Sequence, residues 1–157
     1  MNDQTIVSTT GEPINEAPVV DNPHAPALPA GYLENGYYAT AEDGTKYLRP
    51  DFLGAYAQQI AAELAPLSAA DFRGAFLRNA KKCLRRGTPY EAQRTCAVSM
   101  LPQAIKLIAM HKAPSILLDF ITVATAAITD SNTFQAFYQH TDAIYSYMLL
   151  NKTQVGG

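Results

Sequence analysis

The spacing of apolar residues after Pro50 constrains the fold of this chain more than any other feature of its sequence. From this residue onward, apolar side chains recur every three or four positions, which is the period of a helix with one buried face. Prolines and glycines separate the segments that show this spacing. We therefore predict an all-α fold, a compact five-helix bundle, with helices over residues 51–64, 68–86, 88–112, 115–129 and 133–150.

Local signals predict where these helices begin, bend and end. Ser68 is expected to cap the second helix and Gly87 to end it. Thr88 is expected to cap the third helix, with Pro89 at its first position. Pro102 lies inside the third helix and should kink or divide it. The fourth helix is apolar on most sides, so we expect it to be the central, buried one.

The composition changes along the chain and predicts its domain organisation. Residues 1–30 contain five of the ten prolines and no helical apolar spacing, which predicts a disordered, acidic tail. Residues 31–50 are rich in Tyr and Gly and should anchor this tail to the domain, with a short hairpin around the turn at 42–44. The helical bundle domain then occupies residues 51–150, and residues 151–157 are expected to fray.

The charge is segregated, although the formal net charge is only −2. Residues 1–45 contain seven acidic residues and no Lys or Arg, and all 12 Lys and Arg follow. Residues 71–112 hold nine of these against two carboxylates. An acidic start ahead of a basic centre suggests a polyanionic partner, and a solvated helix face is the alternative.

The second helix gathers this positive charge on one side. On a helical wheel its aromatic and aliphatic residues fill one sector, and a stripe without acidic residues fills the opposite one. Like charges at i, i+3 and i+4 repel each other, and a row of phosphates is the simplest compensation. A solvated face and an acidic protein partner are the alternatives. The stripe comprises Arg78, Lys81, Lys82, Arg85 and Arg86.

Two further features of this helix bear on how it would bind RNA. Arg73 lies in the apolar sector of the wheel, so we expect it to be buried and paired within the bundle, a structural residue first and an RNA ligand second. No exposed aromatic residue alternates with the charges, which argues against base stacking as the binding mode.

Residues that could carry catalysis or bind a metal are sparse. His24, His111 and His140 have no His or Cys four positions away, so we expect ordinary surface or half-buried histidines and neither a metal site nor a cofactor. Cys83 and Cys96 are expected to be free thiols rather than a disulfide. The chain contains no phosphate-binding loop and no nucleophile motif. We therefore predict that it is not an enzyme.

The sequence also predicts where the protein works. No segment approaches the roughly 20 apolar residues that cross a bilayer. Residues 1–10 lack the basic and then apolar pattern of a secretory signal. We expect a cytoplasmic protein without a membrane partner.

Five short segments, in the same order along the chain, resemble the small subunit of the Csm complex, the type III-A CRISPR effector. The first segment matches a Leu-Arg-Pro sequence that precedes the family's first helix. The second segment matches the capped start of the family's second helix. The third matches a Tyr-x-x-x-Arg pattern, and the last two match the final helix, with Asp in place of the usual Glu. The segments are Tyr47–Leu53 (YLRPDFL), Leu67–Arg73 (LSAADFR), Pro89–Arg94 (PYEAQR), Thr133–Phe137 (TFQAF) and Asp142–Tyr147 (DAIYSY).

This resemblance implies a five-helix subunit, present in several copies along a filament, that binds RNA through its backbone and does no chemistry. Arg73 and Arg94 match arginines on the family's second and third helices. Gly74 stands where the family commonly has a basic residue, so no contact is carried over there. The implied partners are guide RNA, target RNA, the backbone and large subunits, and further copies of this chain.

A helical protein–protein adaptor without nucleic-acid contact is the alternative function. Its binding face would include Tyr145, Tyr147 and Met148 on the last helix. The RNA-binding hypothesis instead assigns the contacts to Arg73, Arg78, Lys81, Lys82, Arg85, Arg86 and Arg94.

Overall fold

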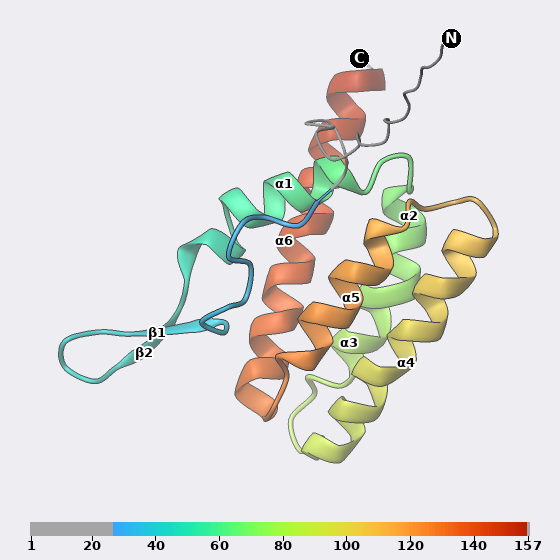
Figure 1. The fold of residues 1–157 in the computed structure, drawn as a ribbon. Helices are drawn as coiled ribbons and strands as arrows, with labels where there is room; N and C mark the ends of the chain where they lie inside the picture. Colours follow the sequence, from blue (N-terminus) through green and yellow to red (C-terminus); the bar gives the residue numbers. More distant parts are fainter. Residues whose placement is uncertain (1–26, 157) are drawn as a thin grey trace, which may run out of the picture.

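The structure of this chain is a computed structural model that describes residues 27–156, with side chains up to Thr153. A small β-hairpin precedes a predominantly helical domain (Figure 1). The elements are β1 Tyr38–Thr40, β2 Lys46–Leu48, the 3₁₀ turn η3 Pro50–Phe52, α1 Ala55–Glu63, α2 Ala69–Phe72, the π-helical segment η4 Arg73–Leu77, α3 Arg78–Lys82, α4 Tyr90–Ala109, α5 Ile116–Ala126 and α6 Ser131–Gly156. Because α2, η4 and α3 follow one another without a break, they form one helix, and the domain has the five helices that the sequence predicts.

Helix α6 is the central element of the bundle. Helices α1, α2 and α4 and the segment η4 all pack against it, whereas α5 packs mainly on α4. Helix α5 also turns Asp119, Thr122 and Ala126 to the surface. The prediction that this helix is the central, buried one is therefore wrong. Its apolar composition serves one broad buried face, made of Ile116, Leu117, Phe120, Ile121 and Ala124.

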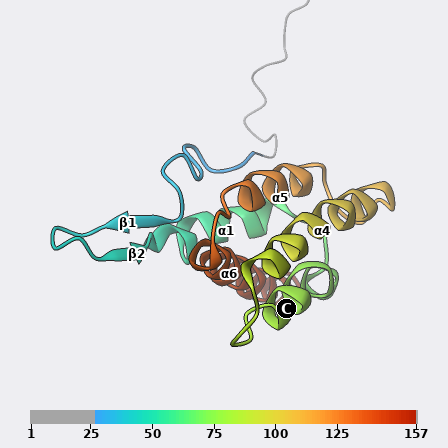
Figure 2. The same cartoon turned by 90° about the horizontal axis from the view of Figure 1, so that it is seen from below.

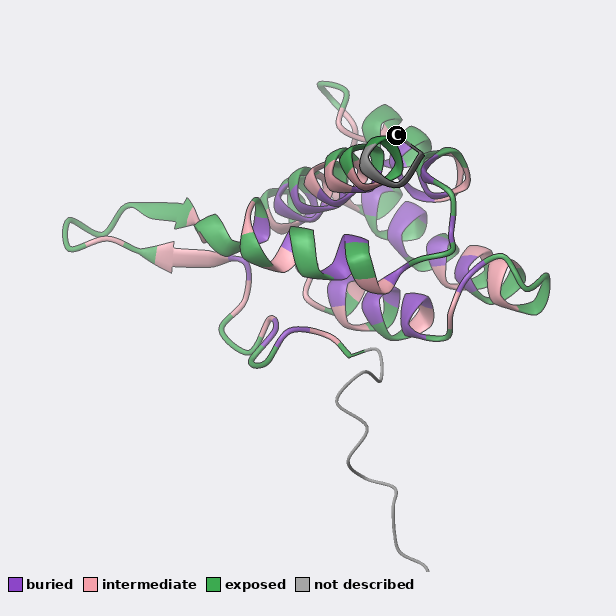
Figure 3. Cartoon of the chain, turned by 90° about the horizontal axis from the view of Figure 1, so that it is seen from above, coloured by how far each residue is buried: buried purple, intermediate pink, exposed green. Residues whose placement is uncertain are grey.

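The core of the bundle is rich in aromatic residues. Figure 3 shows that the buried positions face the inside of the bundle, while the hairpin is mostly exposed. Buried aromatic side chains contribute more apolar area than any other residue type, so they account for much of the stability of a domain of this size. The fully buried phenylalanines are Phe52, Phe72, Phe76, Phe120, Phe134 and Phe137.

Strands β1 and β2 form the short hairpin that the sequence suggests. They are antiparallel, and Ala39 lies opposite Tyr47. The hairpin extends beyond the helices on the side of α1 (Figures 1 and 2). In its turn, the Thr45 N–H donates to the Asp43 carboxylate over 2.9 Å. The class is thus mostly helical, with this hairpin as an addition.

The segment before the hairpin is tied to the helices. The Tyr37 hydroxyl is buried and donates to the carbonyl of Ala124 over 2.9 Å. The Ala27 N–H donates to the Glu63 carboxylate over 2.9 Å. The predicted disordered tail at 1–30 lies, as far as residue 26, outside the described residues. Residues 27–30 belong with the anchoring segment, which was expected to begin only at Gly31.

The ends of the helices agree with the sequence signals in part. Ser68 caps α2 as predicted, because its hydroxyl accepts the N–H of Asp71 over 3.0 Å. Pro89, by contrast, is the residue before α4 rather than its first residue, and the Thr88 side chain makes no capping bond. That cap is therefore predicted one position too early.

Two helices are longer than a division at Pro102 and a frayed end would leave them. Helix α4 continues through Pro102, which is exposed, so water can bond the carbonyl that the missing N–H leaves free. Helix α6 extends to Gly156, so residues 151–156, which were expected to fray, continue the helix.

Candidate nucleic-acid interface

The candidate site is carried by the continuous helix α2–η4–α3. Its buried side is formed by Phe72, Phe76, Leu77 and Ala80, which fix the helix against the rest of the bundle. All five residues of the predicted basic stripe, at positions 78, 81, 82, 85 and 86, are exposed. The separation of an apolar side from a cationic side is therefore present in the folded chain.

Arg73 is exposed, so the prediction that it is buried and paired is wrong. The reason is η4, in which the N–H of Arg78 bonds to the carbonyl of Arg73 five residues earlier. Such a π turn holds one more residue than an α turn, and it rotates the residues before it relative to those after it. Phe72 and Phe76 are both buried, whereas Arg73 is exposed on the side of Arg78.

A groove of about 400 Å³ lies between this helix and α6, and we call it the basic groove. The wall formed by this helix and the turn after it includes five of the seven predicted RNA-binding residues, so the folded chain brings these five together. The wall from α6 adds two tyrosines and one carboxylate. The lining residues are Arg73, Leu77, Arg78, Lys81, Lys82 and Arg85 on one side, and Tyr138, Asp142 and Tyr145 on the other.

The basic groove has an excess of positive charge, with five cations against the single carboxylate of Asp142. Among residues 27–153, no carboxylate lies within 4.0 Å of any of these five cationic groups. The ion pair formed in this part of the chain lies elsewhere, between Lys112 and Asp71 at 4.0 Å. Uncompensated cations along one groove concentrate positive potential and attract an anionic partner.

Two opposite charges in the groove act on Tyr138. Partial burial raises the pKa of its hydroxyl, the Asp142 carboxylate raises that pKa further, and Arg73 opposes both. The hydroxyl is therefore protonated at neutral pH and can donate a hydrogen bond to an anion.

The two remaining predicted residues lie outside the basic groove. Arg86 is exposed in the turn after α3. Arg94 lies on α4, beside Glu91, and lines a separate, mainly apolar depression of about 600 Å³. Neither of them lines the basic groove, although Arg86 directly follows Arg85 in the chain.

The sequence did not predict which residues of α6 would form the second wall of the groove. Tyr138, Asp142 and Tyr145 are spaced i, i+4 and i+7, so they lie on one face of α6. That spacing is visible in the sequence, but it does not tell which helix the face will meet.

His140 is fully buried, although the sequence predicts a surface or half-buried histidine. Its Nδ1 lies 2.6 Å from the carbonyl oxygen of Phe52, and its Nε2 lies 2.6 Å from the Tyr32 hydroxyl. A carbonyl only accepts, so Nδ1 carries the proton and Nε2 accepts from the tyrosine. Burial lowers the pKa of His140 to about 4, against the opposing effect of the bond to Phe52. With both nitrogens engaged, this histidine is a structural residue rather than a catalytic one.

Cys83 and Cys96 are free thiols. Burial raises the pKa of Cys96 to about 12, and the neighbouring Cys83 adds to the effect. A thiol with so high a pKa is a poor nucleophile at neutral pH.

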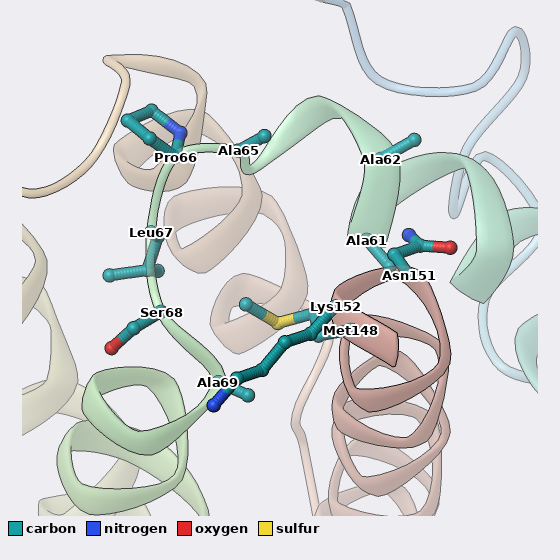
Figure 4. A pocket seen from close by; sticks show the side chains of 10 residues that line it. All are labelled: Ala61, Ala62, Ala65, Pro66, Leu67, Ser68, Ala69, Met148, Asn151 and Lys152. Carbon is teal, nitrogen blue, oxygen red and sulfur yellow. The ribbon is translucent and has the colours of Figure 1, made fainter. Parts of the chain in front are cut away.

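A larger depression, of about 630 Å³, lies between the end of α1 and the end of α6. Figure 4 shows that alanine side chains, together with Pro66, Leu67 and Met148, make up most of its lining. Lys152 is its one ionisable side chain. Its chemistry offers neither an acid–base pair nor a row of cations.

Across residues 27–156, no helix has both the length and the apolar character needed to cross a membrane. The same part of the chain holds no group of three or more His, Cys, Asp or Glu that could bind a metal ion.

Comparisons with known proteins add no relative from which a function could be transferred. The likeness to the Csm small subunit therefore stays a resemblance of short segments, and the basic groove is the feature from which a function can be argued. No protein family, no curated protein and no solved structure matches this chain.

Proposed function

We propose that this chain is a non-enzymatic, RNA-binding small subunit of a type III-A CRISPR effector that acts in the cytoplasm in antiviral defence. One observation carries the proposal: five exposed cations, four on one helix and Arg85 in the turn after it, line a single groove, and no carboxylate of the described chain pairs with them. Phosphates are the anions that RNA offers in a row.

The dimensions of the groove suit an RNA backbone. Arg73 and Lys82 lie nine positions apart on the helix, and at about 1.5 Å per helical residue this part of the row is roughly 13 Å long, with Arg85 in the turn that follows. This length lets the row follow several consecutive phosphates. Contacts to phosphates carry no sequence information, which suits a subunit that must accept any guide sequence.

The resemblance of the five segments supports the choice of this complex. It supplies the proposed partners, which are guide RNA, target RNA, the backbone and large subunits, and further copies of the chain. Arg94 stays a proposed RNA contact on the resemblance alone, since it lies outside the groove. Arg86 is exposed, and the proposal that it binds RNA depends on its position in the basic stripe.

The first test is a charge reversal at the centre of the row. We expect Lys81→Glu with Arg85→Glu to weaken retention of target RNA by the assembled complex at least about tenfold at about 0.15 M salt, since two phosphate contacts become repulsions. RNA retention is measured by filter binding, and folding by circular dichroism.

The matched control is Lys106→Glu with Lys152→Glu. It changes the net charge by the same amount at exposed positions outside the groove, and it should leave retention as in the wild type. Equal retention by the groove variant and the wild type would overturn the proposal.

A helical protein adaptor is the second candidate. In the face first expected for it, Met148 is buried and Tyr145 lines the basic groove. Helix α4 instead exposes apolar side chains, with Val98 at 54% and Ile105 at 53% exposure. A partner that survives nuclease treatment, and is lost on Val98→Asp but not on the groove charge reversal, would favour the adaptor.

A further inference from the structure

We infer that the basic groove takes RNA as an unpaired strand, with phosphates on the cationic wall and bases stacked on Tyr138 and Tyr145 of α6. The inference rests on the proposed function and specifies which form of RNA the groove selects. The α6 wall of the groove, with its two tyrosines, carries it.

These two tyrosines differ from the structural tyrosines of the fold. The hydroxyls of four other tyrosines bond to partners within the domain, at positions 32, 37, 38 and 90. Within residues 27–153, the hydroxyls of Tyr138 and Tyr145 have no such partner. In the same residues, neither ring packs against another aromatic ring, whereas Tyr32 and Tyr37 both do. Both rings are half-buried and line the groove, so they are held in place with one side open.

The spacing of the rings provides two separate platforms. Seven residues on an α-helix correspond to about 10 Å along its axis. This exceeds the roughly 4.5–7 Å at which aromatic rings stack on one another. Tyr138 and Tyr145 therefore do not stack on each other, and both rings are available to bases.

The charges set the orientation of the strand. Asp142 lies between the two tyrosines on α6 and repels phosphates from that wall. The five cations are on the opposite wall and attract them. The bases are thereby directed to the tyrosines, and the Asp142 carboxylate can accept a hydrogen bond from a base amino group or a ribose hydroxyl.

A duplex cannot use both walls in this way. Its bases are already stacked and paired, so a double-stranded RNA presents phosphates and ribose hydroxyls but no base faces. Aromatic rings beside a cationic groove are the combination that binds single strands without sequence preference. The lack of aromatic residues within the basic stripe does not exclude stacking, because the rings come from a helix about 60 positions further along the chain.

The test compares an oligouridine of about 16 nucleotides with the same strand paired to oligoadenosine, both labelled, on the full chain at about 0.1 M salt. We expect the wild type to bind the single strand at least about tenfold more tightly than the duplex, since base stacking is available only to the unpaired strand. Tyr138→Leu with Tyr145→Leu should lose this preference and leave duplex binding unchanged. Fluorescence anisotropy measures both affinities.

Two further variants keep the result interpretable. Tyr138→Phe with Tyr145→Phe retains both rings and should bind like the wild type, even if the leucine variant folds poorly. Tyr147→Leu, two positions from Tyr145 and outside the groove, should also bind like the wild type.

The outcomes separate the two proposals. Equal affinity of the wild type for both RNAs, or loss of single-strand preference in the phenylalanine variant, overturns stacking on these rings and leaves backbone binding standing. Unchanged binding of both RNAs by Lys81→Glu with Arg85→Glu overturns backbone binding by the groove and the inference with it.

Discussion

At the scale of single residues, His140 shows how the fold joins distant parts of the chain. Its two ring nitrogens reach Phe52 and Tyr32, and its ring packs near Phe120. The histidine thus holds the anchoring segment and η3 against the central helix. Because charging the ring would break the bond that Nε2 accepts and place a cation in the core, the neutral form is favoured.

This burial predicts a specific loss of stability in mild acid. The pKa of His140 is about 4 in the folded chain and near 6.5 in the unfolded chain, so between these values only the unfolded state takes up a proton. Lowering the pH from 7.5 to 5 should therefore lower the free energy of unfolding by about 2 kcal/mol.

Urea unfolding at the two pH values measures the effect, and His140→Gln is the control because it removes the titration. The variant should be less stable than the wild type at pH 7.5 and should show a smaller difference between the two pH values. An identical pH dependence in both proteins would contradict the account of this histidine.

At the scale of elements, the helix α2–η4–α3 shows what the sequence could and could not predict. The cap at Ser68 and the outward stripe were predictable, because both follow from local spacing. The π turn was not predictable, because a helical wheel assumes a uniform period. For this reason the wheel places Arg73 on the buried side, whereas it is exposed. The sequence also predicts α5 rather than α6 as the central helix, and this is wrong. The apolar content of a helix indicates how much of it is buried, but not how many helices pack against it.

Gly74 offers a test of this element. It lies inside η4, and a Cβ added there would meet no atom within 4 Å. Gly74→Ala should therefore stabilise the chain by about 0.5–1 kcal/mol, through the lower conformational entropy of the unfolded state. Gly87→Ala is the contrasting variant and should destabilise, because Gly87 has φ +89°. Both are measured by urea unfolding, and a destabilised Gly74→Ala would contradict this description of η4.

At the scale of the whole molecule, the candidate site arises from the packing of two helices. The cations come from residues 73–85 and the tyrosines from α6, which the bundle brings to the two sides of one groove. The cationic wall was predictable from the sequence, whereas the opposite wall was not, because no local signal tells which faces of two helices meet. The same packing separates Arg94 from the groove.

The dependence of RNA affinity on salt tests most directly whether the groove binds the backbone. Each phosphate contact to a single strand contributes about −0.7 to the slope of log affinity against log salt. Replacing Arg73, Arg78 and Arg85 together by glutamine should therefore make the slope shallower by about 2. Lys106→Gln with Lys152→Gln should leave it unchanged. A slope in the triple variant equal to that of the wild type would contradict the claim that these cations bind RNA phosphates.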